Sequence, residues 1–244
     1  MRTLMLIVLS LVLVGARAQE AADSVVIVED DCHRFAPQQL LAGGGLLLTG
    51  IALTVDHDNG VNRAVDDAFG SEHRWHGDDV LRFVPSAAYL TLGVFGVKAR
   101  HNFKERTLIF LTSHAAMAAM AYGTKYAIDK TRPDGGDHSF PSGHVALAFT
   151  GAELVRLEYG NAWGAGAYVV AGTTAVLRLK NRRHWLGDVM AGAGIGLLSA
   201  HIGYWLLPVE RRLFGLRDSR ATVVAAPSYD PFSRSATFTL NARF

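Results

Sequence analysis

The sequence contains one cysteine, Cys32, so no disulfide bond can form within the chain. It also lacks a strong charge of either sign, because the formal net charge at pH 7 is +2 and the basic residues stand in short clusters. A basic nucleic-acid-binding face is therefore not expected. Histidine, cysteine and aspartate do not occur at the spacings of common metal sites, so the sequence predicts neither a metal nor another cofactor.

Long apolar stretches are abundant. Half of the residues are hydrophobic and the mean hydropathy is +0.17. Five apolar runs predict long helices, and they cover residues 80–97, 108–128, 145–157, 163–177 and 189–207. A sixth run, residues 40–55, is interrupted by three glycines and is short for a full crossing of a bilayer. We predict an all-α, membrane-embedded bundle of about six helices, with residues 40–55 re-entrant or lying along the surface. A soluble helical bundle is the alternative.

Both ends of the chain differ from this central part. Residues 1–18 have a basic start, an apolar run and a small-x-small ending, which is typical of a signal peptide, with an uncleaved anchor as the alternative. Residues 19–36 are polar and acidic and predict a flexible lead-in. The helical domain is expected over 37–207. Residues 208–244 begin with a basic segment, and the strict alternation of 235–244 predicts a strand of a small C-terminal β-hairpin.

Three short clusters of residues suited to binding and cleaving phosphate lie between positions 125 and 188. They read Lys125-x6-Arg132-Pro133, then Pro141-Ser142-Gly143-His144, then Arg178-x5-His184-x3-Asp188. Lysine and arginine offer fixed positive charge to phosphate oxygens. Each of the three cations on its own fits a basic side chain at a membrane interface, but together they supply a complete phosphate cradle.

The second and third clusters add the reactive groups. Ser142 is a favoured residue type for the start of a helix, and Gly143 lets a ligand approach the backbone where free N–H groups bind anions. His144 would then lie beside the bound phosphate. If helical, His184 and Asp188 share one face, so Asp188 can accept a hydrogen bond from one ring nitrogen and leave the other free to attack phosphorus.

The order and spacing of the three clusters resemble the signature motifs of the type 2 phosphatidic acid phosphatase superfamily, which includes bacterial acid phosphatases and vanadium haloperoxidases. The match covers residues 125–188, and the helical pattern extends it to about 40–207. One position departs from the family pattern, since Leu177 stands where a serine usually precedes the arginine. This change affects the positioning of phosphate rather than the class of reaction. The resemblance implies that His144 is the general acid.

The expected activity is metal-independent hydrolysis of a phosphomonoester or diphosphate of a membrane lipid, through a phosphohistidine on His184. Substrate candidates are polyprenyl diphosphate, phosphatidate or phosphatidylglycerophosphate, and lipid A phosphates. The alternatives are a soluble exported acid phosphatase, a vanadium-dependent haloperoxidase and a non-enzymatic membrane scaffold. The expected partners are a lipid phosphate and the membrane, without nucleic acid, and the sequence does not indicate an oligomeric state.

The expected location is the bacterial inner membrane, with several crossings and the site facing the periplasm. The basic connector at 98–106 is typical of a cytoplasmic loop, whereas the acidic stretch 56–79 is typical of the outer side. Histidines outside the three clusters are assigned by their surroundings. His101 lies in a polar connector and is expected in solvent, while His114 and His201 lie in apolar runs and are expected to pack between helices.

Overall fold

The computed structural model describes residues 37–55, 60–70, 75–216, 222–230 and 235–243. The chain divides into two compact units, Met1–Pro208 and Val209–Phe244. The expected signal peptide, 1–18, and lead-in, 19–36, lie outside the described residues. The described part of the first unit is helical, as the all-α prediction for this part of the chain required.

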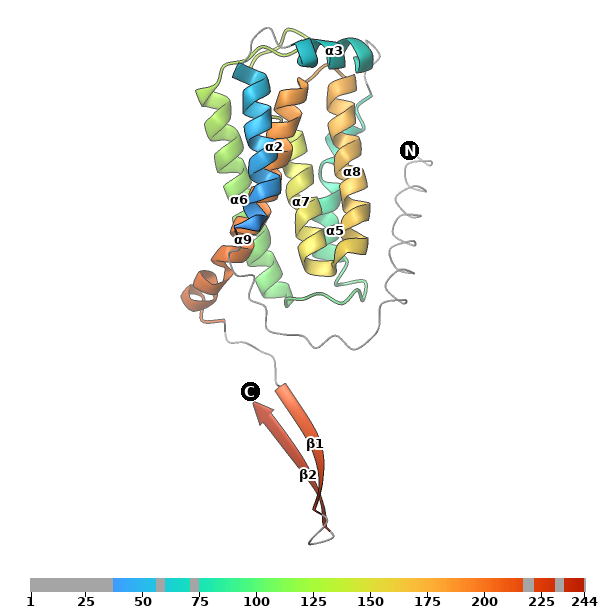
Figure 1. Ribbon diagram of the computed structural model, residues 1–244, viewed down its shortest axis with the longest axis vertical. Coiled ribbons are helices and arrows are strands. Elements are labelled where there is room, and N and C mark those ends of the chain that lie inside the picture. The colour runs from blue at the N-terminus through green and yellow to red at the C-terminus, as the bar shows by residue number, and fades with distance from the viewer. Residues whose placement is uncertain (1–36, 56–59, 71–74, 217–221, 231–234, 244) are drawn as a thin grey trace. The chain divides into compact units, whose positions relative to one another are not determined.

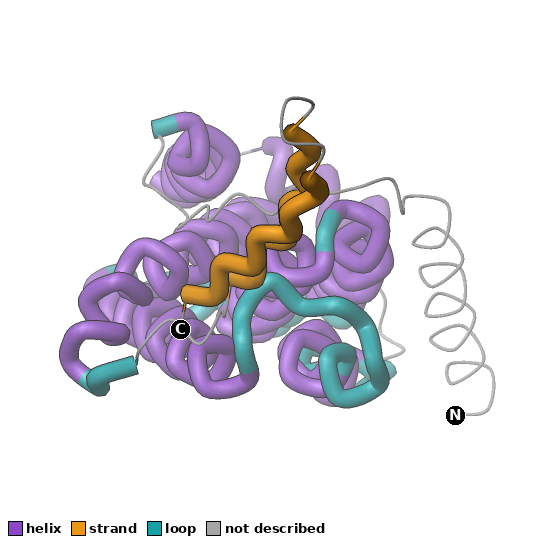
Figure 2. Tube along the Cα trace, turned by 90° about the horizontal axis from the view of Figure 1, so that it is seen from below, coloured by secondary structure: helices purple, strands orange, loops and turns teal. Residues whose placement is uncertain are grey.

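Long helices of the first unit lie side by side, and the short helix α3 crosses one end of them (Figure 1). Seen from below, the same helices group around one another without a sheet between them (Figure 2). In chain order the helices are α2 (Gln38–Val55), α3 (Gly60–Phe69), α4 (Asp78–Leu81), α5 (Val84–Thr91), α6 (Phe103–Ala127), α7 (Gly143–Tyr159), α8 (Asn161–Lys180) and α9 (Leu186–Leu213).

The expected single helix over residues 80–97 is wrong. The chain instead forms α4 and the eight-residue α5, followed by turns. Pro85 stands in the first turn of α5, where its missing N–H costs nothing, and it cannot continue a helix that enters from α4. Gly96 has a φ of +89°, a conformation that favours glycine. With the chain broken between α4 and α5, Asp78 at the start of α4 contacts Arg178 on α8, and Asp79 contacts His144 on α7.

Glycines bring α7 and α9 into close contact. A Cβ atom added to Gly192 would lie 2.6 Å from the carbonyl oxygen of Ser142, and one on Gly196 would lie 2.7 Å from that of Ala146. Real Cβ atoms do not approach so closely, so both positions require glycine. The Gly192-x3-Gly196 pair is therefore a specific helix contact rather than ordinary small-residue packing.

A second glycine contact joins α2 to α9. A Cβ on Gly50 would lie 2.5 Å from the backbone of both Gly187 and Ala191, and one on Gly194 would lie 2.6 Å from the carbonyl oxygen of Gly43. Residue numbers rise along α2 as they fall along α9, so the two helices run antiparallel. The C-terminal end of α2 consequently lies beside the N-terminal end of α9.

Among the described residues, two helices are long and apolar enough to cross a membrane. These are α2, with a mean hydropathy of 1.4, and α9, with 1.3. Most of α2 is exposed, whereas most of α9 is buried between other helices. A largely exposed apolar helix is consistent with a membrane location.

Buried polar contacts hold the helices together away from the predicted site. His114 lies 3.0 Å from Ser86 Oγ, and Nε2 of His201 lies 3.0 Å from a carboxylate oxygen of Glu153, as expected for packing histidines. His101, which was expected in solvent, is instead held by the backbone and ring contacts that it makes with the buried Glu158, the ring contact measuring 2.9 Å. The buried carboxylate of Glu158 needs hydrogen-bond partners, and His101 supplies two of them.

The second unit contains two paired strands. β1 (Thr222–Asp230) and β2 (Ser235–Arg243) are antiparallel, with Thr222 opposite Arg243 and Asp230 opposite Ser235.

Candidate active site

The three clusters meet at one end of the first unit. The end of α6 and the loop after it carry the first cluster, and the start of α7 carries the second. The third runs from Arg178, at the end of α8, to Asp188, in the first turn of α9. The backbone N–H of Ser142 donates to the carbonyl oxygen of Asp188 at 3.0 Å, which joins the second cluster to the third. The ammonium group of Lys125 donates to the carbonyl oxygen of His138 at 2.8 Å, which joins the first cluster to the loop before the second.

Lys125 has spare hydrogen-bonding capacity. Its Nζ atom lies 2.8 Å from the carbonyl oxygen of His138 and 3.4 Å from that of Pro141. An ammonium group carries three protons, so these two contacts leave one donor. The two carbonyl contacts hold the ammonium group in place, and its third N–H can donate a hydrogen bond to a phosphate oxygen.

Two arginines present buried donors that lack partners. Nη1 of Arg178 donates to Asp78 at 2.7 Å, and Asn181 donates to the other oxygen of Asp78 at 3.2 Å. The Nε atoms of Arg178 and Arg132 are both buried and have no hydrogen-bond partner among the described residues. Because an unsatisfied buried donor is costly, these atoms indicate a site that an anion completes.

The start of α7 has the same character. Ser142 precedes the first residue of α7, as predicted, but its side chain caps no backbone N–H. Its Oγ atom is buried and lacks a partner among the described residues. A Cβ atom at Gly143 would meet no described atom within 4 Å. The helix start therefore has a free hydroxyl and open space, as expected for the binding of an anion.

His184 is buried, and its ring is oriented by a backbone carbonyl. Nδ1 lies 2.7 Å from the carbonyl oxygen of Ser139, which can only accept, so Nδ1 carries the proton and Nε2 is free. The expected hydrogen bond to Asp188 is absent, since the carboxylate lies 3.8 Å from Nδ1, beyond hydrogen-bonding distance. The pKa of His184 is lowered to about 4, mainly by burial; the charges of Arg178 and Arg132 act in the same direction, and Asp188 opposes them.

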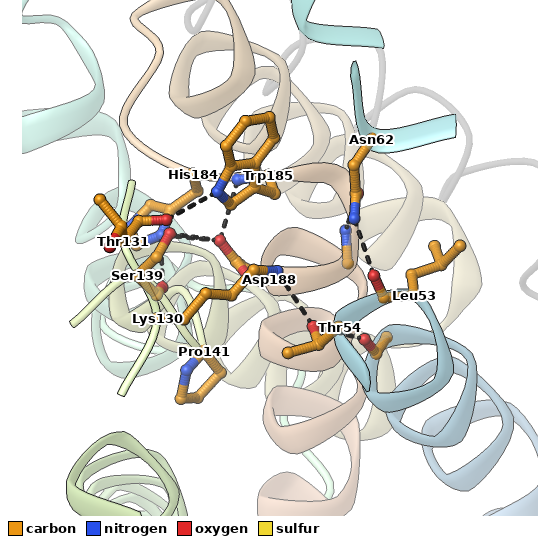
Figure 3. Close-up of polar contacts among 12 residues, drawn as sticks. Leu53, Thr54, Asn62, Lys130, Thr131, Ser139, Pro141, His184, Trp185 and Asp188 are labelled. Atoms are coloured by element: carbon orange, nitrogen blue, oxygen red, sulfur yellow. Dashed lines mark hydrogen bonds and ion pairs between the residues drawn. The ribbon is translucent and has the colours of Figure 1, made fainter. Parts of the chain in front are cut away.

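Asp188 binds other groups instead (Figure 3). Oδ1 accepts from Lys130 at 2.9 Å, and Oδ2 accepts from the backbone N–H of Trp185 at 2.9 Å and from the hydroxyl of Ser139. Asp188 lies in the first turn of α9, whereas His184 precedes that helix. The predicted helical spacing therefore does not apply, because the helix begins two residues after His184.

His144 is held by two residues that the sequence analysis did not identify. Its Nε2 atom lies 2.9 Å from Oδ1 of Asp79 and 2.8 Å from Nη1 of Arg82. The hydrogen bond to His144 lowers the pKa of Asp79, so the carboxylate is ionised at neutral pH. Burial and the charge of Arg178 are the main causes that lower the pKa of His144 to about 4; Arg82 acts in the same direction, and the hydrogen bond to Asp79 opposes the shift.

One group of side chains has metal-like spacing among the described residues. The ligand atoms of Asp78, Asp79 and His144 all lie within 4.8 Å of one another. Two guanidinium groups already neutralise this group, because Arg178 lies 2.7 Å from Asp78 and Arg82 lies 2.8 Å from His144. Since these fixed cations would repel a divalent ion, we interpret the group as one that positions the ring of His144.

An apolar groove lies between α5, α7 and α8 and has a volume of about 90 Å³. Val84, two residues after Arg82, and Trp163 are among its lining residues. Val170 also lines it and precedes Arg178 by eight residues on α8, about 12 Å along the axis. The groove thus follows the helices that carry the polar site.

Comparisons with known proteins agree with the motifs. A family model described as the PAP2 superfamily matches residues 113–212. A lipid A 1-phosphatase from Porphyromonas gingivalis is 36% identical over 165 residues, which are 66% of this chain and 37% of that protein. The chain thus spans little more than a third of this relative's length.

Two solved structures show a general likeness. The Aquifex aeolicus LpxE structure is 20% identical, with a TM-score of 0.49 over 61% of this chain and 97% of that one. A transmembrane PAP2 type phosphatidylglycerolphosphate phosphatase from Bacillus subtilis is 18% identical, with a TM-score of 0.49 over 74% of this chain and 100% of the other.

Proposed function

Because the chain belongs to the type 2 phosphatidic acid phosphatase superfamily, we propose that it is a metal-independent lipid phosphatase that forms a phosphohistidine on His184. The observation that carries this proposal is the set of unpartnered buried groups, Arg132 Nε, Arg178 Nε and Ser142 Oγ. They accompany a histidine whose free nitrogen has a low proton affinity. Phosphate oxygens would satisfy these donors while phosphorus faces His184.

In the first step, the lone pair of His184 Nε2 attacks phosphorus and the bond from phosphorus to the lipid oxygen breaks. His144 gives its proton to that oxygen, so the lipid leaves as an alcohol, or as a monophosphate from a diphosphate substrate. In the second step, water attacks phosphorus and gives a proton to His144. The phosphorus–nitrogen bond breaks, and inorganic phosphate and neutral His184 are released.

The cations supply transition-state stabilisation. Charge develops on the equatorial oxygens as phosphorus becomes five-coordinate, and Lys125, Arg132 and Arg178 are assigned to those oxygens. Arg178 is pre-positioned by its ion pair with Asp78, at 2.7 Å. Ser142 and the backbone at Gly143 complete the anion site at the start of α7. Fixed donors of this kind need little reorganisation during the reaction.

The apolar groove favours a lipid over a soluble phosphate ester as the substrate. Its lining from α5, α7 and α8 suits a hydrocarbon chain, and one lining residue, Val84, follows by two positions Arg82, which contacts His144. Among lipid phosphates, the name of the Porphyromonas gingivalis relative makes the 1-phosphate of lipid A the first candidate to test. Phosphatidate, phosphatidylglycerophosphate and polyprenyl diphosphate remain in the substrate panel.

We place the site at the periplasmic face of the bacterial inner membrane, in a bundle with several crossings. α2 supports a revised topology, because its 18 residues span about 27 Å and run antiparallel to α9. In this arrangement α2 crosses the membrane, and the connector at 98–106 lies at the cytoplasmic end with its basic residues. Alkaline phosphatase fused after residue 70 should be active, and fused after residue 103 inactive. The reverse pattern would overturn the orientation.

The function is tested by phosphate release from purified protein in detergent. The panel contains the four lipid phosphates and a water-soluble phosphomonoester, each with EDTA and with added Mg²⁺. We expect release from at least one lipid phosphate, unchanged by EDTA, blocked by vanadate, and lost in His184→Ala, His144→Ala and Arg132→Ala. Activity that requires Mg²⁺, or that survives in His184→Ala, would contradict the proposal.

A further inference from the structure

Lys130 lies in the spacer of the first cluster, but its side chain serves the third. Its Nζ atom lies 2.9 Å from Oδ1 of Asp188 and 3.1 Å from Oγ1 of Thr54 (Figure 3). The side chain of Lys130 is 14% exposed and that of Asp188 is fully buried. A buried carboxylate is costly unless it is paired and hydrogen-bonded, so Lys130 is the counter-ion that keeps Asp188 ionised inside the protein.

This ion pair bears on His184 through Ser139. The hydroxyl of Ser139 donates to Oδ2 of Asp188, while the carbonyl oxygen of the same residue accepts the Nδ1 proton of His184 at 2.7 Å. Asp188 itself lies 3.8 Å from the ring. The order of contacts is therefore Lys130, Asp188, Ser139, His184. Moving the carboxylate would move the carbonyl group that orients the ring.

Helix α2 enters this set of contacts from the other side. Thr54, in its last turn, holds Lys130, and Asn62 of α3 joins the same region (Figure 3). Asn62 donates to the carbonyl oxygen of Leu53 at 2.8 Å and accepts from the backbone N–H of Gly187 at 3.1 Å. The last turn of α2 is thereby bonded to Lys130, and the start of α3 to the start of α9.

We propose that Lys130 is a positioning residue for the nucleophile, and that Thr54 on α2 holds Lys130 in place. This inference rests on the proposed function and extends it. It gives α2 a part in the reaction besides its place in the bundle. It also separates the role of Lys130 from that of Lys125. Lys130 Nζ contacts Asp188 and Thr54, whereas Lys125 contacts the loop carbonyls and keeps one donor for phosphate.

The test compares steady-state kinetics of four variants with the wild type, using the lipid phosphate released fastest. A misplaced nucleophile costs about 100-fold in rate, so Lys130→Met should lose about that in kcat while KM stays within about threefold. Lys130→Arg should recover most of the loss, because a guanidinium can pair with both Asp188 and Thr54. Thr54→Val should show a smaller loss of kcat, again with KM unchanged. The control is Lys180→Met, which removes an exposed charge at the end of α8 and should behave as wild type.

Each departure from this pattern has a definite meaning. A raised KM with an unchanged kcat in Lys130→Met would overturn the inference by making Lys130 a direct phosphate ligand. A wild-type kcat in Lys130→Met would overturn it outright. If Lys130→Met does not yield folded protein, Thr54→Val decides, and an unchanged kcat there also counts against it. Absence of phosphate release from the wild type with every substrate would instead refute the proposed function.

Discussion

The ring of His184 donates its Nδ1 proton to the carbonyl oxygen of Ser139 over 2.7 Å. A carbonyl oxygen cannot donate, so this contact alone fixes the tautomer and leaves Nε2 unprotonated, as the proposed nucleophile requires. Asp188 contributes indirectly, by binding the hydroxyl of Ser139 and the backbone N–H of Trp185. The orientation of the nucleophile is thus a property of the loop before α7 as much as of its own segment.

The burial of His184 predicts an unusual titration. Burial lowers its pKa to about 4, so the neutral, nucleophilic ring persists as the pH falls through 6.5 and takes up a proton only near pH 4. A phosphomonoester itself titrates near pH 6, so the pH dependence of the activity reports the ionisation of the substrate together with that of His184. NMR of protein labelled with ¹⁵N-histidine, compared with His184→Ala, measures the titration of the His184 ring alone. A titration near pH 6.5 assigned to His184 would contradict the buried geometry.

The pairing of His144 with Asp79 predicts a dependence on the leaving group. A general acid matters for an alkyl alcohol and hardly for p-nitrophenolate, which departs without a proton. His144→Ala should therefore lose about 100-fold or more in kcat on a lipid phosphate and much less on p-nitrophenyl phosphate.

Asp79→Asn should follow the same direction with a smaller loss, because it removes the carboxylate that favours the protonated ring. Asp67→Asn, at an exposed position on α3, is the matched control and should leave the kcat on both substrates unchanged. Equal losses on both substrates in Asp79→Asn would show that Asp79 does not act through proton transfer.

The apolar groove predicts a dependence on chain length. A side chain at Gly166 would enter the groove without a clash, because a Cβ there meets no described atom within 4 Å. Gly166→Leu should raise KM for long-chain lipid phosphates by about fourfold for each CH₂ group kept out of the groove.

The same variant should leave hydrolysis of a short-chain, water-soluble phosphate ester unchanged. Gly172→Leu is the control, since this glycine lies on the same helix, has equal space, and does not line the groove. If both variants have the same effect, or neither has one, the hydrocarbon chain lies elsewhere.

The close approach of α2 to α9 predicts a strong effect of a single methyl group. Gly50→Ala places a Cβ 2.5 Å from backbone atoms of Gly187 and Ala191, so the helices must separate, at a cost of about 1–3 kcal/mol. Gly45→Ala points a methyl into open space and should be neutral. Thermal unfolding in detergent measures both variants. Equal melting temperatures would mean that α2 does not pack on α9 as described.

Much of the site could be predicted because phosphate chemistry restricts residue types and spacing. Lys125, Arg132, Arg178 and both histidines were identified from the three clusters, and the structure brings them to one end of the helices. Ser142 was correctly placed before α7, although its hydroxyl does not cap the helix and is buried without a partner among the described residues. These residues carry reactive or charged groups, so their function can be recognised without knowing their neighbours.

The supporting residues could not be predicted in this way. Asp79 meets His144 across 65 positions of sequence, and nothing in the acidic stretch 56–79 distinguishes it from solvated carboxylates. Lys130 lies in a spacer where the motif specifies no residue. The break between α4 and α5 had a signal in Pro85, but the apolar composition of 80–97 outweighed it. Long-range pairing decides such roles, and residue type alone does not reveal it.

The most direct test of the central claim is to trap the phosphorylated intermediate. Wild-type protein is mixed with ³²P-labelled lipid phosphate, quenched with alkali within milliseconds to seconds, and digested into peptides. The account predicts an acid-labile, alkali-stable label on the peptide that contains His184, and no label in His184→Ala. Label on a peptide without His184, or phosphate release by His184→Ala at the wild-type rate, would contradict it.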